Sequence, residues 1–481
     1  MEREAVVDAA THLIERLEGE EAVAHAVVGG ECADRTRIDV TERRRPKSAI
    51  GLEERGVWCR VFAHGSVEYR YSDSLDPDDL DELARRAVSS CRHLATDVPV
   101  RFDAGSLHRD GHDGWAAPGE RLDGRTVDEK AEDCVDAVSE YLGSEAGRIR
   151  LRYRDESRET TLLDTNGSAV RTRLDSAAFG ATMAGEVTVR DHLGGTTGSA
   201  VFEELPGMLS GLRERFDRGR SAEVTDLEAD EREVLLAPKA AGRLVRALVT
   251  YLEADAVAMG QSPFEAGDRF GSKRLTIHDT ITPGGFTARA YDTEIRPTSP
   301  VSLVDRGEIA ALYHDSVSAI DRETSPAGSV LPGIEREFPP RIAPRHVDVA
   351  PGTVPDRELR ERATVAIERL GRPRRTNETT RRVRASHVPP DVHYAARMGE
   401  RAPDGGDERI EFPIEGGYLL VDGDRGARIE GATVEVEPTV LSGLAALGRV
   451  RETLTGTVEK HRTTLPFEVT SPAMVLSCSV G

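Results

Sequence analysis

The sequence predicts an α+β protein in which an N-terminal domain of sheet and helices precedes a mostly antiparallel, β-rich C-terminal domain. Three observations support this fold class. The chain has 481 residues, which is too long for a single hydrophobic core. Helical and strand patterns alternate in its first half. From residue 275 onward, short strand patterns separated by Gly and Pro dominate. Such a change of pattern along the chain is typical of α+β architecture.

The first domain is expected to begin with an amphipathic helix over residues 3–18, because apolar side chains recur there on one face. A second helix is expected after Asp76, which is a suitable N-cap, with Pro77 at the first helical position. Between these helices lie four strand patterns, the last two forming a hairpin around His64-Gly65, at residues 22–28, 37–41, 57–62 and 67–71.

The remainder of this domain is predicted as a long loop, a helix, several strands and a final helix. Residues 98–124 are rich in Pro, Gly, Asp and His, which indicates a loop. Thr126 and Glu129 have the spacing of a capping box for a helix that ends near Leu142. Asn166-Gly167 indicates a hairpin turn. The strands are expected at 148–154, 160–163, 169–174 and 179–189, and the last helix at 202–219. The charged run 221–233 then separates the predicted domains, residues 1–222 and residues 223–481.

The second domain is expected to open with a strand at 234–236 and, after Pro238, an apolar helix over 239–253. Its stripe of Leu, Val and Ala predicts a buried helix. Another helix is expected at 355–370, and an Arg-rich loop at 372–384. Antiparallel strands are expected at 410–414, 417–421, 427–429 and 432–436.

The charge balance is strongly acidic. There are 85 Asp and Glu residues against 64 Lys and Arg, which gives a net charge of −21, and only five of the basic residues are lysine. An acid-rich, Lys-poor surface suits a halophilic cytoplasm of molar salt, because counterions screen the repulsion between carboxylates. An ordinary acidic protein whose arginine bias reflects codon composition is the alternative. In both cases, such a surface repels phosphate backbones and disfavours nucleic-acid binding.

The five cysteines and the N-terminal sequence bear on the compartment. Five is an odd number, and no two cysteines have CxxC spacing, so free thiols in a reducing compartment are expected. The first residues have no basic and apolar signal pattern, and no stretch approaches 18 apolar residues. We therefore expect a cytoplasmic protein that is not inserted in a membrane.

Several segments resemble the TldD/PmbA family, whose members pair as TldD and TldE (PmbA) subunits. The N-terminal half contains a strand, turn and Ala-rich helix similar to those of the family. The C-terminal half repeats the family's order of a helix followed by three short motifs. The segments that carry the resemblance are Gly56-Val57-Trp58-Cys59-Arg60-Val61 with Leu83-Ala84-Arg85-Arg86-Ala87, the helix 239–257, Gly260-Gln261-Ser262-Pro263-Phe264, Asp292-Thr293-Glu294-Ile295-Arg296-Pro297-Thr298 and Leu303-Val304-Asp305-Arg306-Gly307.

The helix 239–257 lacks the residues that would hold zinc in the TldD branch. That branch carries a His-Glu-x-x-x-His motif on this helix. In the best register, Val245, Arg246 and Thr250 occupy the positions of the first His, the Glu and the second His. None of the three can bind zinc as the motif does or act as a carboxylate base. The resemblance therefore implies a TldE/PmbA-type chain with no catalytic residue and no metal site of its own.

Asp292, Glu294 and Arg296 are the expected residues of a substrate cleft, since they lie in the family's Asp-x-Glu-Gly-x-Pro-Thr segment. Two carboxylates at this spacing share one face of a strand. Local pairing within a turn is the alternative interpretation. Ile295 stands where the family usually has Gly, which puts any glycine-dependent backbone conformation in question. His314 beside Asp315 is expected to be a structural pair.

Other His and Cys residues are weaker candidates for metal ligands. The pair His108 and His112 lies in a Gly- and Asp-rich segment, where a solvated loop is the simpler interpretation. His387 and His393 are off helical register. The resemblance suggests a late cysteine as a third zinc ligand in TldD, which draws attention to Cys478. Without the two histidines, however, burial as a small apolar side chain is expected.

The resemblance implies a two-subunit zinc protease that degrades unfolded peptides and matures peptide precursors. We expect this chain to be the non-catalytic subunit, paired as a heterodimer with a TldD-like chain that supplies the zinc. An extended peptide substrate could bind by strand addition. Two alternatives stay open. One is a regulatory binding protein that modulates DNA gyrase without proteolysis. The other is a homodimeric hydrolase with an unrecognised site, so self-association of the lone chain is also open.

Overall fold

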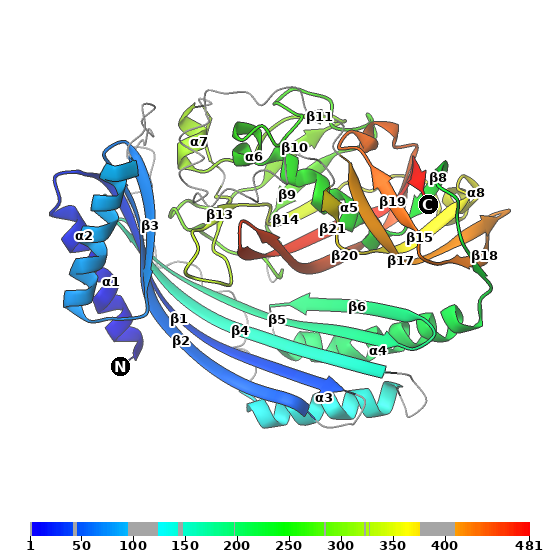
Figure 1. Ribbon diagram of the computed structural model, residues 1–481, viewed down its shortest axis with the longest axis horizontal. Helices are drawn as coiled ribbons and strands as arrows, with labels where there is room; N and C mark the ends of the chain where they lie inside the picture. The colour runs from blue at the N-terminus through cyan, green and yellow to red at the C-terminus, as the bar shows by residue number, and fades with distance from the viewer. Residues whose placement is uncertain are drawn as a thin grey trace.

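A long, curved antiparallel sheet forms the first part of the computed structural model, and a larger sheet lies on its concave side (Figure 1). The structure describes residues 2–41, 46–94, 124–142, 148–196, 198–282, 285–321, 324–326, 328–375 and 409–481. The mixture of helices and strands, with strands dominating the C-terminal part, confirms the predicted α+β class. None of the helices in these ranges combines the length and hydropathy needed to cross a bilayer.

The first sheet has six strands in the order β3-β2-β1-β4-β5-β6, and every neighbouring pair is antiparallel. Several of its strands are longer than the sequence patterns indicated, because polar inward-facing residues interrupt the alternation without interrupting the strand. The predicted strands 22–28 and 37–41, for example, are one strand. The strands are β1 (Val23–Thr41), β2 (Pro46–Ala63), β3 (Ser66–Ser72), β4 (Arg148–Asp164), β5 (Ala169–Ala184) and β6 (Thr188–Gly195).

Four helices cover the convex face of this sheet (Figure 1). Alternate residues of β1 explain the layering: Ala26 and Val28 pack in the cluster under the first two helices, whereas Val27 belongs to a cluster on the opposite face. The predicted capping box is present, since Thr126 Oγ1 accepts from the Glu129 N–H and the Glu129 carboxylate accepts from the Thr126 N–H. The helices are α1 (Glu2–Glu18), α2 (Pro77–Leu94), α3 (Val127–Leu142) and α4 (Gly198–Ser221).

The second sheet has 13 strands, and its longest path runs β11-β10-β9-β14-β21-β8-β15-β17-β18-β7. Most pairs are antiparallel, but β14 with β21, β15 with β8, and β18 with β7 are parallel. The strands of this region are β7 (Val224–Thr225), β8 (Asp230–Leu236), β9 (Ile277–Thr280), β10 (Val301–Asp305), β11 (Glu308–Ile309), β14 (His346–Val349), β15 (Val365–Leu370), β16 (Arg374–Arg375), β17 (Ile410–Val421), β18 (Asp424–Ile429), β19 (Thr433–Val436), β20 (Ala446–Lys460) and β21 (Thr463–Val480), with β12 (Val330–Leu331) and β13 (Arg341–Ile342) forming a separate ladder.

Short helices connect these strands, and one of them lies over the centre of the sheet. The side chains Ala241, Leu244 and Leu248 of α5 are at most 1% exposed and form part of the largest core cluster, together with residues of β21. The long hairpin of β20 and β21 was only partly foreseen from the sequence, which indicated a strand near Cys478. The helices are α5 (Pro238–Leu248), α6 (Ala254–Ala258), α7 (Ser316–Asp321) and α8 (Asp356–Glu361), with 3₁₀ turns η2 (Val249–Leu252) and η3 (Val440–Gly443).

The prediction of one helix over residues 355–370 is wrong. Only α8 is helical, and the chain then enters β15, which lies between β8 and β17. Leu359, Ala363, Ala366 and Leu370 imitate helical spacing. Val365 and Ile367 are β-branched and fully buried, which favours a strand, and this strand pairs with β8 and β17 on its two sides. Most of the predicted loops 98–124 and 372–384 lies outside the described residues.

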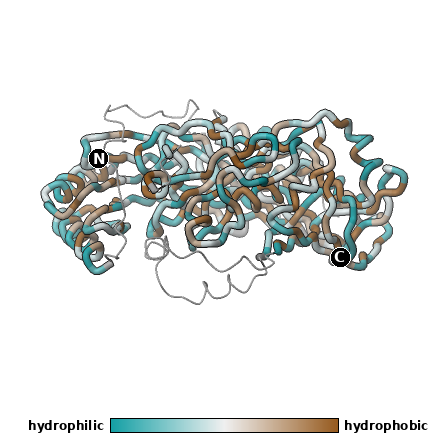
Figure 2. The backbone as a smooth tube through the Cα atoms, turned by 90° about the horizontal axis from the view of Figure 1, so that it is seen from above, coloured by the Kyte–Doolittle hydropathy of each residue, from teal (hydrophilic) through white to brown (hydrophobic). Residues whose placement is uncertain are grey.

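The two sheets meet along a seam on the concave face of the first sheet (Figure 1). The termini lie toward opposite ends of the long axis (Figure 2). The first sheet's elements end with α4 at Ser221 and the second sheet begins at Val224. Whether residues 1–222 and 223–481 fold as separate units stays a prediction. Arginine side chains cross the seam: Arg35 donates to the Ile334 carbonyl at 3.0 Å and Arg158 donates to the Gly333 carbonyl at 3.0 Å.

Asp191 of β6 is a second point where charge holds the two parts together. Its carboxylate pairs with Arg369 of β15, with Arg215 of α4 at 2.7 Å and with Lys239 of α5 at 3.5 Å. Burial alone would raise the pKa of Asp191, but the charges of Arg369, Lys239 and Arg215 outweigh burial and hold the pKa at about 2. The ionised carboxylate is therefore stabilised by folding.

Replacing Asp191 with Asn should lower the free energy of unfolding at pH 7 by ~2 kcal/mol, as expected for a pKa held that far below the ordinary value of 3.8. Because the folded pKa is depressed, this stability is present above pH ~4 and is lost as the pH falls toward 2. Denaturant unfolding of both proteins across this pH range measures the effect. Asp217→Asn is the control, since Asp217 is 42% exposed and pairs only within α4. Equal unfolding midpoints for the wild type and Asp191→Asn at pH 7 would contradict the argument.

Candidate functional site

The helix α5 and the turn η2 place the three motif positions in a packed environment. Val245 is fully buried in the core. Arg246 is 4% exposed, and its guanidinium carbon lies 5.6 Å from the centre of the Phe467 ring. This is a cation–π distance. Thr250 Oγ1 donates to the Ala247 carbonyl at 2.7 Å. The three side chains therefore have structural roles within the domain.

A single lysine forms ion pairs with the two carboxylates that follow this helix. Glu253 precedes α6 and Asp255 lies within it. Lys460, at the end of β20, donates to both carboxylates and to the Ile342 carbonyl, each at 2.7 Å. Burial is the largest influence on the pKa of Lys460 and opposes the charged form, but the two carboxylates outweigh it and raise the pKa. Sequence reasoning missed this cluster because Lys460 is more than 200 positions from its partners.

These residues do not fit a zinc ion. The motif positions supply an apolar side chain, a cation and a hydroxyl that already donates, and the nearby carboxylates are paired with an ammonium group. Cys478 of β21 is buried, and desolvation, reinforced by Glu233 and Glu231, raises the pKa of its thiol to about 12. A thiol in this state is a poor zinc ligand. Within the described ranges, no group of three His, Cys, Asp or Glu side chains could hold a metal.

Lys460 is followed by a hairpin turn with an unfavourable backbone. His461 and Arg462 connect β20 to β21 and have φ angles of 48° and 68°. Two-residue hairpins with positive φ at both positions usually contain Asn-Gly, because other residues are strained there. The turn positions Lys460 on one side for its contact with Glu253 and Asp255. The strain of the turn is compatible with a functional constraint on the side chains of His461 and Arg462.

Asp292 organises the segment that was predicted to line a substrate cleft. Its carboxylate accepts from the backbone N–H groups of Glu294 at 2.9 Å, Arg296 at 3.0 Å and Val330 at 3.1 Å. Burial and the neighbouring Glu294 charge raise the pKa of Asp292, although the three N–H donors oppose this shift. A carboxyl group surrounded by backbone donors acts here as the support of a turn.

Ile295 adopts a conformation that usually requires glycine. Its φ angle is 58°, in the left-handed region, where a β-branched residue is strained. The side chain is nevertheless 2% exposed and packs with Val27, Trp58 and Leu162 of the first sheet. The backbone conformation expected for a glycine is thus retained at this position, and the added side chain fills the seam between the two sheets.

Glu294 and Arg296 connect this turn to neighbouring elements. Glu294 pairs with Arg60 of β2 and accepts from both the N–H and the hydroxyl of Ser316. Arg296 Nε donates to Ser316 Oγ at 2.9 Å. Arg60 also lies 3.4 Å from the Asp315 carboxylate. Because Glu294 is only 4% exposed at its side chain, it holds the Arg60 guanidinium in a defined position across the seam.

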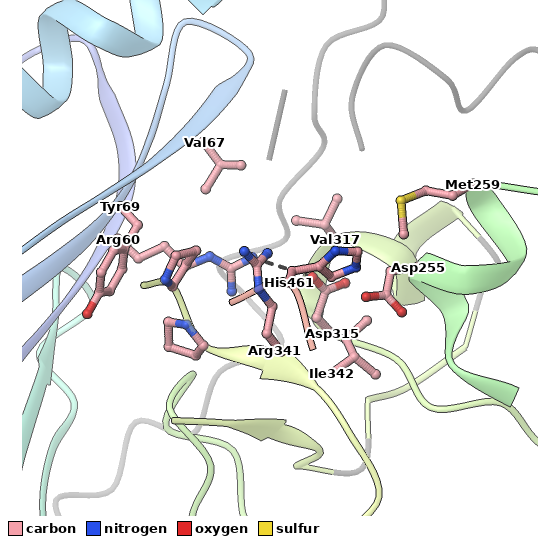
Figure 3. A pocket seen from close by; sticks show the side chains of 12 residues that line it. Arg60, Val67, Tyr69, Asp255, Met259, Asp315, Val317, Arg341, Ile342 and His461 are labelled. Atoms are coloured by element: carbon pink, nitrogen blue, oxygen red, sulfur yellow. Dashed lines mark hydrogen bonds and ion pairs between the residues drawn. The ribbon is translucent and has the colours of Figure 1, made fainter. Parts of the chain in front are cut away.

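A small cavity of about 60 Å³ lies in front of Arg60 (Figure 3). The labelled side chains come from both parts of the protein: Arg60 and Tyr69 extend from the first sheet, whereas Asp255, Asp315 and His461 belong to helices and turns that accompany the second sheet. The cavity can hold a few water molecules or one small side chain. Its wall presents two arginines, Arg60 and Arg341, two carboxylates and an imidazole. It could therefore bind the polar groups of a peptide.

The predicted cleft residues do not themselves line this cavity. Asp292, Glu294 and Arg296 lie behind its wall and are 1%, 3% and 8% exposed. Their role toward a substrate stays a prediction. Asp315 does line the cavity, while the adjacent His314 is buried with its Nδ1 3.2 Å from Ser318 Oγ. The candidate ligands His108, His112, His387 and His393 lie outside the described residues.

The pKa of His25, on β1, is affected by the positive charges of the same region. It is fully buried, and its Nδ1 lies 3.0 Å from Thr165 Oγ1. Burial, followed by the charges of Arg60 and Arg296, lowers the pKa of His25 to about 3. The imidazole is therefore neutral at any physiological pH. The positive charges of Arg60 and Arg296 thus extend to the buried side chain of His25.

Comparison with known proteins identifies relatives of the fold. Residues 229–383 match the family model described as the PmbA/TldA metallopeptidase C-terminal domain. No curated protein matches the chain. Similar solved structures include a candidate modulator of DNA gyrase from Bacteroides thetaiotaomicron, with 16% identity and a TM-score of 0.74 over 99% of this chain and 98% of that one.

Two further structures have the same fold. A second candidate modulator of a DNA gyrase, from Thermotoga maritima, has 14% identity and a TM-score of 0.72 over 99% of this chain and 100% of that one. TldE from Thermococcus kodakarensis has 13% identity and a TM-score of 0.71 over 98% and 100%. At these identities the likeness shows a shared fold over nearly the whole length of each chain.

A double-mutant cycle of Arg60→Met and Glu294→Gln should reveal the coupling across the seam. Each single change leaves the remaining charge only with a longer contact, 3.4 Å from Arg60 to Asp315 or 3.9 Å from Glu294 to Arg296, and should cost about 3 kcal/mol in the free energy of unfolding. The double variant should cost less than the sum, with a coupling energy of 1 kcal/mol or more, on the order found for contacting pairs. Chemical denaturation measures all four proteins. Additive single effects would show that the two side chains do not interact.

Replacing His461-Arg462 with Asn-Gly should stabilise the fold. The new residues tolerate positive φ at both turn positions, so the free energy of unfolding should rise by ~1 kcal/mol. Thermal unfolding compares this variant with the wild type. The matched control replaces His64 with Asn in the β2–β3 turn, where φ is 53° and Gly65 already follows, so that at most a smaller gain is expected. A lower melting temperature for the Asn-Gly variant would contradict the assignment of strain to the turn.

Proposed function

Because the chain belongs to the TldD/PmbA family, we propose that it is the non-catalytic subunit of a heteromeric zinc peptidase that acts on unfolded or precursor peptides. The partner is a TldD-like chain that carries the His-Glu-x-x-x-His motif. Zinc bound by that chain would polarise the scissile carbonyl and activate water. The present chain completes the substrate chamber.

The packing of α5 and η2 is the observation that carries this proposal. At the three motif positions, Val245 is enclosed in the core, Arg246 lies against Phe467 and Thr250 donates to the backbone. A metal at this position would have to displace a buried arginine. The helix has therefore become a packing element, which is the role expected of it in a subunit that leaves the chemistry to its partner.

The cavity beside Arg60 is where this chain would meet the peptide. Glu294 holds Arg60 toward the cavity, and the Asp292 turn holds Glu294. The planar Arg60 guanidinium lies at the wall of the cavity, and it could bind a peptide carbonyl or carboxylate. In this proposal Arg60 binds the substrate, while Asp292, Glu294 and Arg296 act as positioning residues behind it.

Regulation of DNA gyrase is the second candidate function. It is favoured by two structures of the same fold that carry the name of gyrase modulators. The net charge of −21 would suit contact with a basic protein surface. The regulator requires gyrase in its complex and no TldD-like partner, so co-purification from the native cytoplasm, at its own salt concentration, distinguishes it from the peptidase subunit.

Purification of the chain alone and with the TldD-like partner tests the proposed function. The lone chain should contain less than stoichiometric zinc and should not cleave unfolded peptides, because its motif positions hold no ligands. The complex should contain one zinc per partner chain and cleave. A complex whose partner has its motif Glu replaced by Gln is the control and should bind zinc without cleaving. Zinc and activity in the lone chain would refute the assignment, as would full activity of the partner without this chain.

A further inference from the structure

A larger cavity lies at the other end of the seam, away from the Arg60 site. It has a volume of about 350 Å³ and is formed where β6 and the end of α4 face β17 and β18. In Figure 1 these elements lie side by side at the lower right, next to α4. The volume is large enough for a small organic ligand. Neither the family motif nor the zinc positions lie in its wall.

The wall of this cavity is rich in arginine. Four glutamates accompany the six arginines of the lining, and Asp191, which pairs with two of these arginines, lowers the excess of positive side chains from two to one. A net positive cavity is unexpected in a chain whose overall charge is −21. The charged lining residues are Arg190, Arg215, Arg218, Arg369, Arg425 and Arg428, with Glu186, Glu368, Glu415 and Glu430.

Two of these arginines belong to the structure of the seam. Arg215 and Arg369 both pair with Asp191 and are fixed by it. The remaining four come from both parts of the protein. Arg190 and Arg218 are on the first, while Arg425 and Arg428 are on β18 of the second. A ligand that contacts both pairs would therefore bridge the seam.

Arg190 pairs closely with Glu415 at 2.7 Å, whereas the ion pairs of Arg218 and Arg428 are long. Arg218 lies 3.7 Å from Glu368, and Arg428 lies 3.5 Å from Glu430, which are long separations for hydrogen bonds. Arg428 Nε is buried without a hydrogen-bond partner. A guanidinium has five N–H donors in a planar fork that matches carboxylate and phosphate oxygens.

One arginine is also held in place by an aromatic ring. The guanidinium carbon of Arg425 lies 3.8 Å from the centre of the Tyr418 ring, and Arg425 pairs with Glu368. Stacking and pairing together restrict the side chain before a ligand arrives, which lowers the entropic cost of binding. Glycines 416, 417, 426 and 431 form part of the same wall and allow a ligand to approach the backbone closely.

We propose that this cavity binds a small ligand with two or more oxyanion groups, which the arginines of the two parts hold between them. Phosphate and carboxylate groups share the required chemistry. Binding would add contacts across the seam at the end opposite to Arg60, so it should stabilise the docked arrangement of the two sheets. The site is separate from the proposed peptide cavity and does not depend on the peptidase assignment.

Isothermal titration of the full chain with inorganic pyrophosphate and, separately, with citrate tests the proposal. Both titrations use one fixed ionic strength at which circular dichroism shows the chain to be folded, since salt screens such contacts. At least one probe should bind with 1:1 stoichiometry. Tighter binding of pyrophosphate assigns a phosphate ligand, and tighter binding of citrate assigns a carboxylate ligand.

Substitutions in the wall identify the site. Arg428→Gln and Arg425→Gln should each weaken binding about 10-fold, the effect expected for losing one charge-assisted hydrogen bond. Gly416→Asp keeps every arginine and adds a carboxylate to the wall. A side chain fits there, because the nearest atom to a Cβ at this glycine is 3.9 Å away. This variant should also weaken binding, and it keeps the test decisive if the arginine variants do not fold.

The control is Arg357→Gln on α8, an arginine that is 91% exposed and pairs with Glu361 within its own helix. It should bind like the wild type. The proposal is overturned if neither probe binds, if Gly416→Asp and the foldable arginine variants bind with unchanged affinity, or if Arg357→Gln weakens binding as much as Arg428→Gln does.

Discussion

The pairing of buried charge between the two sheets is the constraint on which the rest of the structure depends. The concave face of the first sheet is not apolar throughout, and where it meets the second sheet it carries buried ionisable side chains such as Glu31, Arg35 and Arg158. A charge removed from water must be paired and hydrogen-bonded, because an isolated one costs several kcal/mol. From the other side of the seam, the Ile334 and Gly333 carbonyls accept from Arg35 and Arg158, and the Glu294 carboxylate pairs with Arg60. The seam therefore specifies one relative placement of the two parts, since a shift would leave several charges without partners.

Internal cations occupy the region in which the family's metal-bearing branch is expected to bind zinc. Arg246 takes a motif position, and Lys460 holds Glu253 and Asp255. A divalent ion concentrates two positive charges at one point. Here the two positive charges are separate: Lys460 contacts the carboxylates, and Arg246 lies against the ring of Phe467. The structural effect is comparable, because the buried Glu253 and Asp255 side chains are paired with a cation within the domain. The chemical effect is different, since neither cation can bind and activate water as zinc does.

The sequence predicts the elements whose signals are local, and it fails where distant residues decide. The capping box at Thr126, the turn at Gly167 and the apolar helix after Pro238 depend on neighbouring residues and are present. Residues 363–370 satisfy helical spacing, yet Val365–Leu370 form a strand, because this segment pairs with β8 on one side and β17 on the other, which local propensity cannot anticipate. The same limit applies to the candidate site. Asp292 and Glu294 could be selected from their motif. Arg60 pairs with Glu294, and Lys460 pairs with Glu253, over more than 200 residues of sequence, and no sequence pattern indicates these two ion pairs.

Backbone strain is found on both sides of the Arg60 cavity. Ile295 lies behind its wall, and His461 is part of its wall, with Arg462 following in the same turn; all three have left-handed φ angles without being glycine. Such conformations persist only where surrounding contacts outweigh their cost. For Ile295 those contacts come from Val27, Trp58 and Leu162, so the strained turn that holds Glu294 depends on the docking of the first sheet. For His461 they include the salt bridges of the adjacent Lys460. Arg60 thus reaches its position only when the two sheets are together, which makes the geometry of the cavity a property of the assembled seam and not of either sheet alone.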